Sequence, residues 1–277
     1  MGRVLVVGRS PMVYDVLRAH SALRGHTVER CTGVLDATHK IREHAYDVVL
    51  TDPETPMSED LAVSREFAAL RPGVRIVVLA PAASDAELIA ALRAHVFGCL
   101  VAPYDPNEIV DMVRSALSVS EWRDGIEVVS GLPNWLTLKV SCQIITADRL
   151  VAFMSEREAG VPEQERDLLI AAFRELLLNA MEHGAGFDPE KVIEVTAART
   201  ARAIVYHFRD PGNGFDAEDL RCAACSTDSE EVLASALRRA ELGMRPGGFG
   251  MLIARQVADE LVYNERHNEV LMIKHLT

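Results

Sequence analysis

Residues 173–184 read Phe-Arg-Glu-Leu-Leu-Leu-Asn-Ala-Met-Glu-His-Gly. The apolar residues of this stretch recur three and four positions apart, so they predict a helix that begins near Pro162 and ends at the final glycine. Glu175, Asn179 and His183 lie four apart and form a second, polar stripe along the same helix. Either Glu175 faces water while Asn179 and His183 are satisfied internally, as in many helices, or the stripe is directed into a cleft.

In a cleft, a carboxylate and an amide one helical turn apart can take part in chemistry. The Glu175 carboxylate could accept a proton as a general base. The Asn179 amide oxygen could bind a hard cation such as Mg²⁺. The rest of the chain must decide between these roles and a structural one.

Length and charge restrict the class of protein. The chain has 277 residues, which predicts two domains. Its 29 basic and 41 acidic residues give a net charge of -12, which disfavours nucleic acid or an anionic membrane as partner. No apolar run approaches the roughly 20 residues that cross a bilayer. The first residues read as a strand and not as a signal peptide, so a cytoplasmic protein with protein or small-molecule partners is expected.

The first 120 residues alternate short apolar strands with helical segments five times. This order predicts an α/β fold with a doubly wound, five-stranded parallel sheet and a functional crevice at the carboxyl ends of its strands. The strands are expected over residues 4–7, 27–30, 47–51, 74–79 and 99–102. The helices are expected over residues 12–22, 35–44, 58–69, 85–95 and 106–117.

Residues 1–120 resemble the receiver domain of bacterial response regulators. Asp52 ends the third strand, and the loop that follows it looks like the loop after the phospho-accepting aspartate of that family. Pro103 and Tyr104 also match the usual Lys-Pro-aromatic corner after the fifth strand. The resemblance therefore implies that Asp52 is a candidate phospho-acceptor.

Several charged groups of that family are missing here. Gly8 and Arg9 replace its Mg²⁺-binding acidic pair, while Ala80 and Ala102 replace its hydroxyl residue and its lysine. Phosphoryl transfer to a carboxylate needs cations that neutralise the developing charge. We therefore expect a degenerate receiver in which the Arg9 guanidinium occupies the metal position and pairs with Asp52. The simpler alternative is an Asp52 carboxylate that is never modified.

A linker is expected over residues 121–134, where sustained periodicity is lost apart from a short strand at 126–129. The second domain is expected over residues 135–277. Its helices are followed by mostly antiparallel strands, which predict a two-layer α/β sandwich.

A strand predicted at residues 204–208 leads into a D-x-G-x-G loop that begins at Asp210. This pattern is often a plain turn. As a ligand loop, it would let the Asp210 carboxylate accept a hydrogen bond from the exocyclic amino group of adenine. Gly212 and Gly214 would allow the backbone to turn tightly against the base.

A second glycine cluster, Gly247-Gly248-Phe-Gly250, opens into a helix predicted at residues 251–260. Amides at such a helix N-terminus can bind phosphate oxygens, although a flexible hinge is the alternative. The polar stretch between the two glycine motifs, residues 216–244, has the length of a mobile lid.

The ordered combination resembles the GHKL ATP-binding fold, named for gyrase, Hsp90, histidine kinases and MutL, over residues 135–277. Its motifs look most like those of anti-sigma-factor serine/threonine kinases. By this resemblance Asn179 coordinates Mg²⁺, Asp210 reads adenine and Glu175 is the catalytic base. The ATP-binding glycines implied by the resemblance are Gly212, Gly214, Gly247, Gly248 and Gly250.

Three functions remain open at this point. The first is an ATP-dependent kinase that phosphorylates Ser or Thr of a protein antagonist of the STAS type, in a partner-switching pathway that controls a sigma factor. The second is a non-catalytic module that binds such partners according to its nucleotide. The third is receiver output without nucleotide chemistry. A homodimer is compatible with all three.

Overall fold

The computed structural model describes residues 1–51, 53–214 and 250–276. The chain forms two compact units, Met1–Asp124 and Gly125–Thr277. Within the described ranges, no helix combines the length and the apolar character needed to cross a membrane.

The first unit is a five-stranded parallel sheet of order β2-β1-β3-β4-β5. The strands are β1 (Arg3–Val7), β2 (Thr27–Cys31), β3 (Val48–Leu50), β4 (Arg75–Ala80) and β5 (Gly98–Val101). Residues 4–7, 48–50 and 75–80 are buried, as expected for strands covered on both faces. The predicted doubly wound sheet is confirmed.

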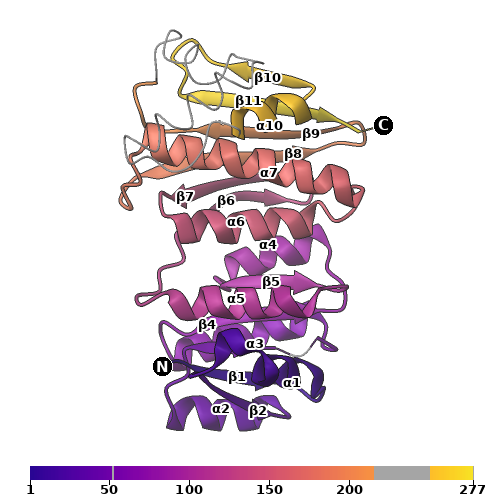
Figure 1. The fold of residues 1–277 in the computed structure, drawn as a ribbon, viewed down its shortest axis with the longest axis vertical. Coiled ribbons are helices and arrows are strands. Elements are labelled where there is room, and N and C mark those ends of the chain that lie inside the picture. The colour runs from indigo at the N-terminus through magenta and orange to yellow at the C-terminus, as the bar shows by residue number, and fades with distance from the viewer. Residues whose placement is uncertain (52, 215–249, 277) are drawn as a thin grey trace. The chain divides into compact units, whose positions relative to one another are not determined.

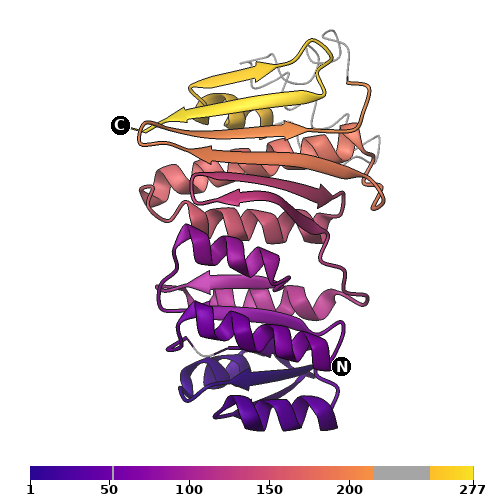
Figure 2. The same ribbon diagram turned by 180° about the vertical axis from the view of Figure 1, so that it is seen from behind.

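Five α-helices cover this sheet. They are α1 (Met12–Ala19), α2 (Val34–Glu43), α3 (Met57–Leu70), α4 (Asp85–Arg93) and α5 (Pro106–Ser118). Helices α1 and α5 pack together on one face, and α2, α3 and α4 pack in series on the other (Figures 1 and 2). Capping boxes at Ser84 and Asp105 fix the starts of α4 and α5 because they satisfy the first amides of each helix.

The second unit has an antiparallel six-stranded sheet of order β10-β11-β9-β8-β7-β6. The strands are β6 (Ile126–Leu132), β7 (Trp135–Ser141), β8 (Val192–Arg199), β9 (Ala203–Arg209), β10 (Glu260–Tyr263) and β11 (Glu269–His275). Helices α6 (Ile144–Arg157), α7 (Glu163–Asn179) and α10 (Gly250–Val257) lie on one face of the sheet (Figure 1). The view from behind shows the strands without helices in front of them (Figure 2). The predicted two-layer sandwich is confirmed.

The expected linker at 121–134 differs from the structure. Residues 126–132 form β6, the edge strand of the second sheet, and this unit begins at Gly125. A register shift between Val128 and Ser130 explains why the sequence looked aperiodic, because a bulge interrupts the in-and-out alternation of a strand.

The second unit also buries a charged cluster. The Glu158 carboxylate is fully buried and accepts a hydrogen bond from Arg199 Nη1 at 2.8 Å. Its other oxygen lies 3.7 Å from Nη1 of Arg157, whose side chain is fully buried too. An ion-pair network thereby joins the end of α6 to β8.

Candidate functional site

Aromatic packing positions α7 over β9. The Phe173 ring meets the Tyr206 ring edge-on at 4.9 Å between centroids, and it contacts the Phe208 ring at 5.1 Å. All three side chains are buried. Because Phe208 is two residues before Asp210, this packing brings the second half of α7 to the end of β9 where the D-x-G-x-G loop begins.

Helix α7 ends in an unusual way. Its last residue is Asn179, and a π-helical turn, Ala180–Gly184, follows directly. Glu175 and Asn179 are half-buried on α7, while His183 in the π turn is exposed. Single π turns inside or at the end of α-helices are frequent at functional sites. Here the turn delivers Gly184 to the Asp210 side chain.

Glycine is required where the two segments meet. A Cβ added to Gly184 would overlap the Asp210 carboxyl group. A Cβ on Gly212 would lie 2.8 Å from Asp210 Oδ1 and 2.8 Å from the Gly184 carbonyl oxygen. The end of the π turn and the loop are therefore in direct contact, and the two glycines form a cradle around the carboxylate.

The Asp210 carboxylate is half-buried, and this burial raises its pKa. Two groups oppose that effect: the Gly212 amide, which donates to Oδ1 at 2.8 Å, and the nearby positive charge of His183. An acceptor of this kind, partly desolvated and held by one backbone donor, is suited to receiving a further hydrogen bond from a ligand.

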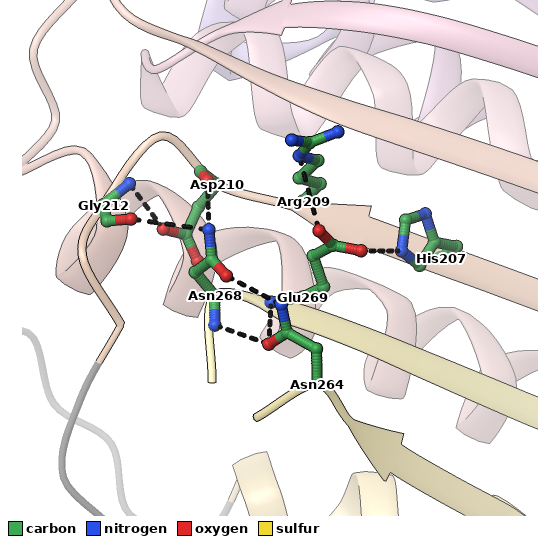
Figure 3. A network of polar contacts seen from close by, with 7 residues as sticks. All are labelled: His207, Arg209, Asp210, Gly212, Asn264, Asn268 and Glu269. Carbon is green, nitrogen blue, oxygen red and sulfur yellow. Dashed lines mark hydrogen bonds and ion pairs between the residues drawn. The ribbon is translucent and has the colours of Figure 1, made fainter. Parts of the chain in front are cut away.

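A turn far along the chain supports the loop from the other side. Gly214 has φ of +80°, and a Cβ there would overlap the Arg266 carbonyl oxygen. The Asp210 amide donates to the Asn268 carbonyl oxygen at 3.0 Å. The Asn268 side-chain amide donates to the carbonyl oxygens of Asp210 and Gly212 at 3.3 and 3.4 Å (Figure 3). No sequence motif around Asn268 indicates that it supports this loop.

Part of the predicted site lies outside the described residues. Gly247, Gly248 and the expected lid at 216–244 belong to the range that the structure does not describe. Gly250 is the first residue of α10, which packs beside α7. The described residues thus bring together Asp210, Gly212 and the end of α7, and they place Gly250 on the neighbouring helix.

The corresponding edge of the first unit carries different chemistry. Arg9 is exposed, and its carbonyl oxygen accepts a hydrogen bond from the guanidinium of Arg30. Arg30 Nε also donates to the Gly8 carbonyl oxygen at 3.2 Å. Sequence reasoning missed Arg30 because β2 gave no sign that its side chain reaches the loop after β1. Asp52 and its predicted pairing with Arg9 lie outside the described residues.

Metal binding by side chains alone has little support in the part of the chain that the structure describes. It contains no group of three or more His, Cys, Asp or Glu residues placed to hold a metal ion. Mg²⁺ bound mainly through phosphate oxygens, with one or two protein ligands, does not require such a group.

Two family models match the chain, one within each of its two structural units. A response regulator receiver domain matches residues 4–114, and a histidine kinase-like ATPase domain matches residues 141–274. The chain joins a receiver domain to an ATPase domain of the histidine-kinase-like type. The resemblance of the two halves to receiver and GHKL-type domains is thereby confirmed.

Curated relatives include response regulators and transcriptional regulatory proteins. The response regulator MprA of Mycobacterium avium is 26% identical over 188 residues, which cover 67% of this chain and 81% of that protein. The transcriptional regulatory protein ZraR of Salmonella typhimurium is 26% identical over 115 residues, 42% of this chain but only 26% of that protein.

Solved receiver structures give a similar result. A CheY-like receiver domain protein from Methanospirillum hungatei has a TM-score of 0.38 at 20% identity, and the match covers 42% of this chain and 94% of that one. A response regulator from Thermotoga maritima has a TM-score of 0.38 at 17% identity, and the match covers 43% of this chain and 99% of that one.

Proposed function

We propose that the ATPase domain binds Mg-ATP and phosphorylates Ser or Thr of a STAS-type protein antagonist in a partner-switching pathway that controls a sigma factor. The receiver domain modulates this activity. The observation that carries the proposal is the half-buried Asp210 carboxylate, held between the glycines at positions 184 and 212.

The described residues fit an adenine nucleotide. An ionised carboxylate can accept about four hydrogen bonds, and the Gly212 amide supplies one to Asp210. The exocyclic amino group of adenine is a donor, whereas guanine presents an acceptor at that position and would be repelled. Asp210 therefore favours adenine over guanine.

The end of α7 fits the metal and the reaction. The half-buried Asn179 offers an amide oxygen of the type that Mg²⁺ accepts. Bound Mg-ATP would supply the γ-phosphoryl group and release ADP, and its Mg²⁺ would neutralise the phosphate charge. Glu175, one helical turn before Asn179, receives the proton of the attacking Ser or Thr hydroxyl group.

A phosphotransfer assay with labelled Mg-ATP and candidate antagonist proteins tests the proposal. Glu175→Gln should reduce transfer by at least about 100-fold, because general bases contribute 10²–10⁴-fold to rate. Nucleotide affinity, measured by calorimetry, should stay unchanged because the substitution keeps the size of the side chain. Glu165→Gln, at an exposed position of the same helix, is the matched control and should leave both quantities unchanged.

Two outcomes would contradict the proposal in different ways. Binding of Mg-ATP without transfer to any antagonist would favour a nucleotide-dependent binding module. Failure of the unmutated protein to bind ATP at all would leave receiver output as the remaining function.

A further inference from the structure

The turn that joins β10 to β11, residues 264–268, is unusually well ordered by its own side chains. Asn264 Oδ1 accepts hydrogen bonds from the amides of Asn268 at 3.1 Å and Glu269 at 3.2 Å. The Asn264 carbonyl oxygen accepts the His267 amide at 3.1 Å. The conformation of the 264–268 turn is therefore fixed from within the hairpin, independently of the D-x-G-x-G loop.

The same asparagine sets the direction of a second one. Asn264 Nδ2 donates to Asn268 Oδ1 at 2.8 Å, so the other end of the Asn268 amide is its NH₂ group (Figure 3). That NH₂ group reaches the carbonyl oxygens of Asp210 and Gly212 at 3.3 and 3.4 Å. One side chain thus joins both sides of the loop that carries the Asp210 carboxylate.

The loop needs such support because it has little of its own. Residues 211, 213 and 214 are exposed, and within the loop the Gly212 amide donates a hydrogen bond to the Asp210 side chain. A carboxylate that discriminates between bases must be held to within a fraction of an ångström. The backbone carbonyls of Asp210 and Gly212 are the atoms through which the loop can be held without occupying the carboxylate.

A second connection lies beside the first, on strand β9. Glu269, the residue after Asn268, lies 3.5 Å from Arg209 Nε and 3.3 Å from His207 Nε2 (Figure 3). Glu269 pairs with Arg209 in the register of β11 and β9. The end of β9 is thereby held to the hairpin immediately before the loop begins.

We infer that Asn268 is the positioning residue of the base-recognition loop, and that it sets both nucleotide affinity and the preference for adenine by holding Asp210 in place. This inference rests on the proposed function, since it assumes that Asp210 reads a base. Asn268 touches no base itself. It acts through two backbone carbonyls, and Asn264 orients it.

The test is calorimetric titration of the full chain with Mg-ATP and with Mg-GTP. Asn268→Asp keeps the size of the side chain but replaces the NH₂ donor by an oxygen that faces two carbonyl oxygens. We expect ATP affinity to fall about tenfold, as for the loss of one or two hydrogen bonds. The ratio of ATP to GTP affinity should fall by a similar factor, because a displaced Asp210 no longer rejects guanine.

The matched control is Asn134→Asp. Asn134 is exposed in the turn between β6 and β7 of the same unit, and its backbone carbonyl oxygen accepts a hydrogen bond from the Arg199 amide. This variant carries the same charge change and should retain the affinity and the ratio. Asn264→Ala provides a second route, since it leaves Asn268 intact but removes the group that orients it, and we expect a smaller loss of both quantities.

The titrations of these variants distinguish three cases. If Asn268→Asp and Asn264→Ala lower the melting temperature but keep the ATP to GTP ratio, the turn is only structural and the inference is wrong. If the unmutated protein binds ATP, Asp210→Asn abolishes binding and the two turn variants bind normally, only this inference fails. If the unmutated protein does not bind ATP, the proposed function fails and this inference fails with it.

Discussion

The two halves of the chain carry different chemistry at the ends of their strands. In the receiver domain, the described residues at the carboxyl edge of the parallel sheet include Gly8, Arg9, Ala80 and Ala102, none of which is an acid. In the ATPase domain, an acid at the end of β9 lies in a cradle of glycines beside the end of α7. The fold of the first unit is thus formed without acids at these positions, whereas the ATPase site depends on polar atoms being placed closely.

The largest effect is expected where that placement is tightest. Gly184→Ala should weaken ATP binding about 100-fold, because a displacement of about 1 Å can have an effect of that size. The added methyl group overlaps the Asp210 carboxyl group and must displace it. Calorimetry with Mg-ATP measures the change.

Gly160→Ala is the matched control. A Cβ at Gly160 has its nearest neighbour, Arg199 Nη2, at 3.4 Å, which is an ordinary contact with a flexible side chain. ATP affinity should therefore be retained in this variant. Normal ATP binding by Gly184→Ala would show that Asp210 can move without loss of function. The close placement of polar atoms would then no longer distinguish the ATPase domain from the receiver domain.

A large effect on stability is expected from the buried charges. Glu158→Ala removes the carboxylate that both Arg157 and Arg199 contact, and it should lower the free energy of unfolding of the ATPase domain by about 3–5 kcal/mol. Differential scanning calorimetry of the full chain should show the transition of the receiver domain unchanged. Glu163→Ala, at an exposed position in the first turn of α7, should change neither transition.

An equal shift of both transitions after Glu158→Ala would be informative in another way. It would mean that the two domains unfold as one cooperative unit. The comparison between independent halves would then have to be replaced by one of coupled halves.

A moderate effect is expected from pH. Burial raises the pKa of Asp210, so its carboxyl group becomes protonated at a higher pH than an exposed aspartate does. The protonated acid loses acceptor capacity, and ATP affinity should fall as the pH decreases through this raised pKa. Calorimetry over a pH series gives the profile. His183 lies close enough to lower the pKa of Asp210, so His183→Gln must be measured as well.

Without nucleotide, the raised pKa of Asp210 favours the folded protein at low pH, which is opposite to its expected effect on ATP affinity. A carboxyl group whose pKa is raised on folding contributes stability at low pH that is lost as the pH rises through the folded pKa. Asp210→Asn should therefore unfold at a higher temperature than the unmutated protein near neutral pH when no nucleotide is present. A lower melting temperature for this variant would mean that the carboxylate contributes more to the fold than its burial suggests.

The last prediction is that a small-molecule phosphoryl donor has no effect on the receiver domain. Incubation with acetyl phosphate and Mg²⁺ should leave Asp52 unmodified, because the acidic pair and the lysine that assist phosphoryl transfer are replaced by Gly8, Arg9 and Ala102. Intact mass spectrometry detects the product. A variant with Arg9→Asp and Ala102→Lys should gain reactivity relative to the unmutated protein. Mg²⁺-dependent phosphorylation of unmutated Asp52 would contradict the expectation of a degenerate receiver.

Local patterns predicted most of the fold. The continuous apolar runs of β1 and β4 and the alternation in β8 and β9 each predict a strand from a few neighbouring residues. The strand expected at residues 126–129 continues to Leu132 in the structure, past a bulge that interrupts its alternation. Strand prediction from alternation fails at such a point, because the residue at the bulge is left out of the pairing.

The sequence predicted only part of the site, because one of its contacts joins residues far apart in the chain. Asp210 and its glycines form a contiguous motif, and Glu175 and Asn179 share one helix face. Asn268 is 58 residues away from Asp210 in sequence, and nothing in the turn itself indicates which loop it supports. Contacts of this kind depend on strand order, since β11 lies next to β9, and strand order is not encoded in a local pattern.

The π turn at the end of α7 limits where residues can be deleted from this chain or inserted into it. A π turn holds one residue more per hydrogen-bonded ring than an α-helical turn. Deleting a single residue from Ala180–Gly184 would allow regular α-helix to continue and would rotate the following glycine away from Asp210. We expect natural or engineered variants to tolerate insertions after β8 or in exposed turns while keeping the residue count of this segment unchanged.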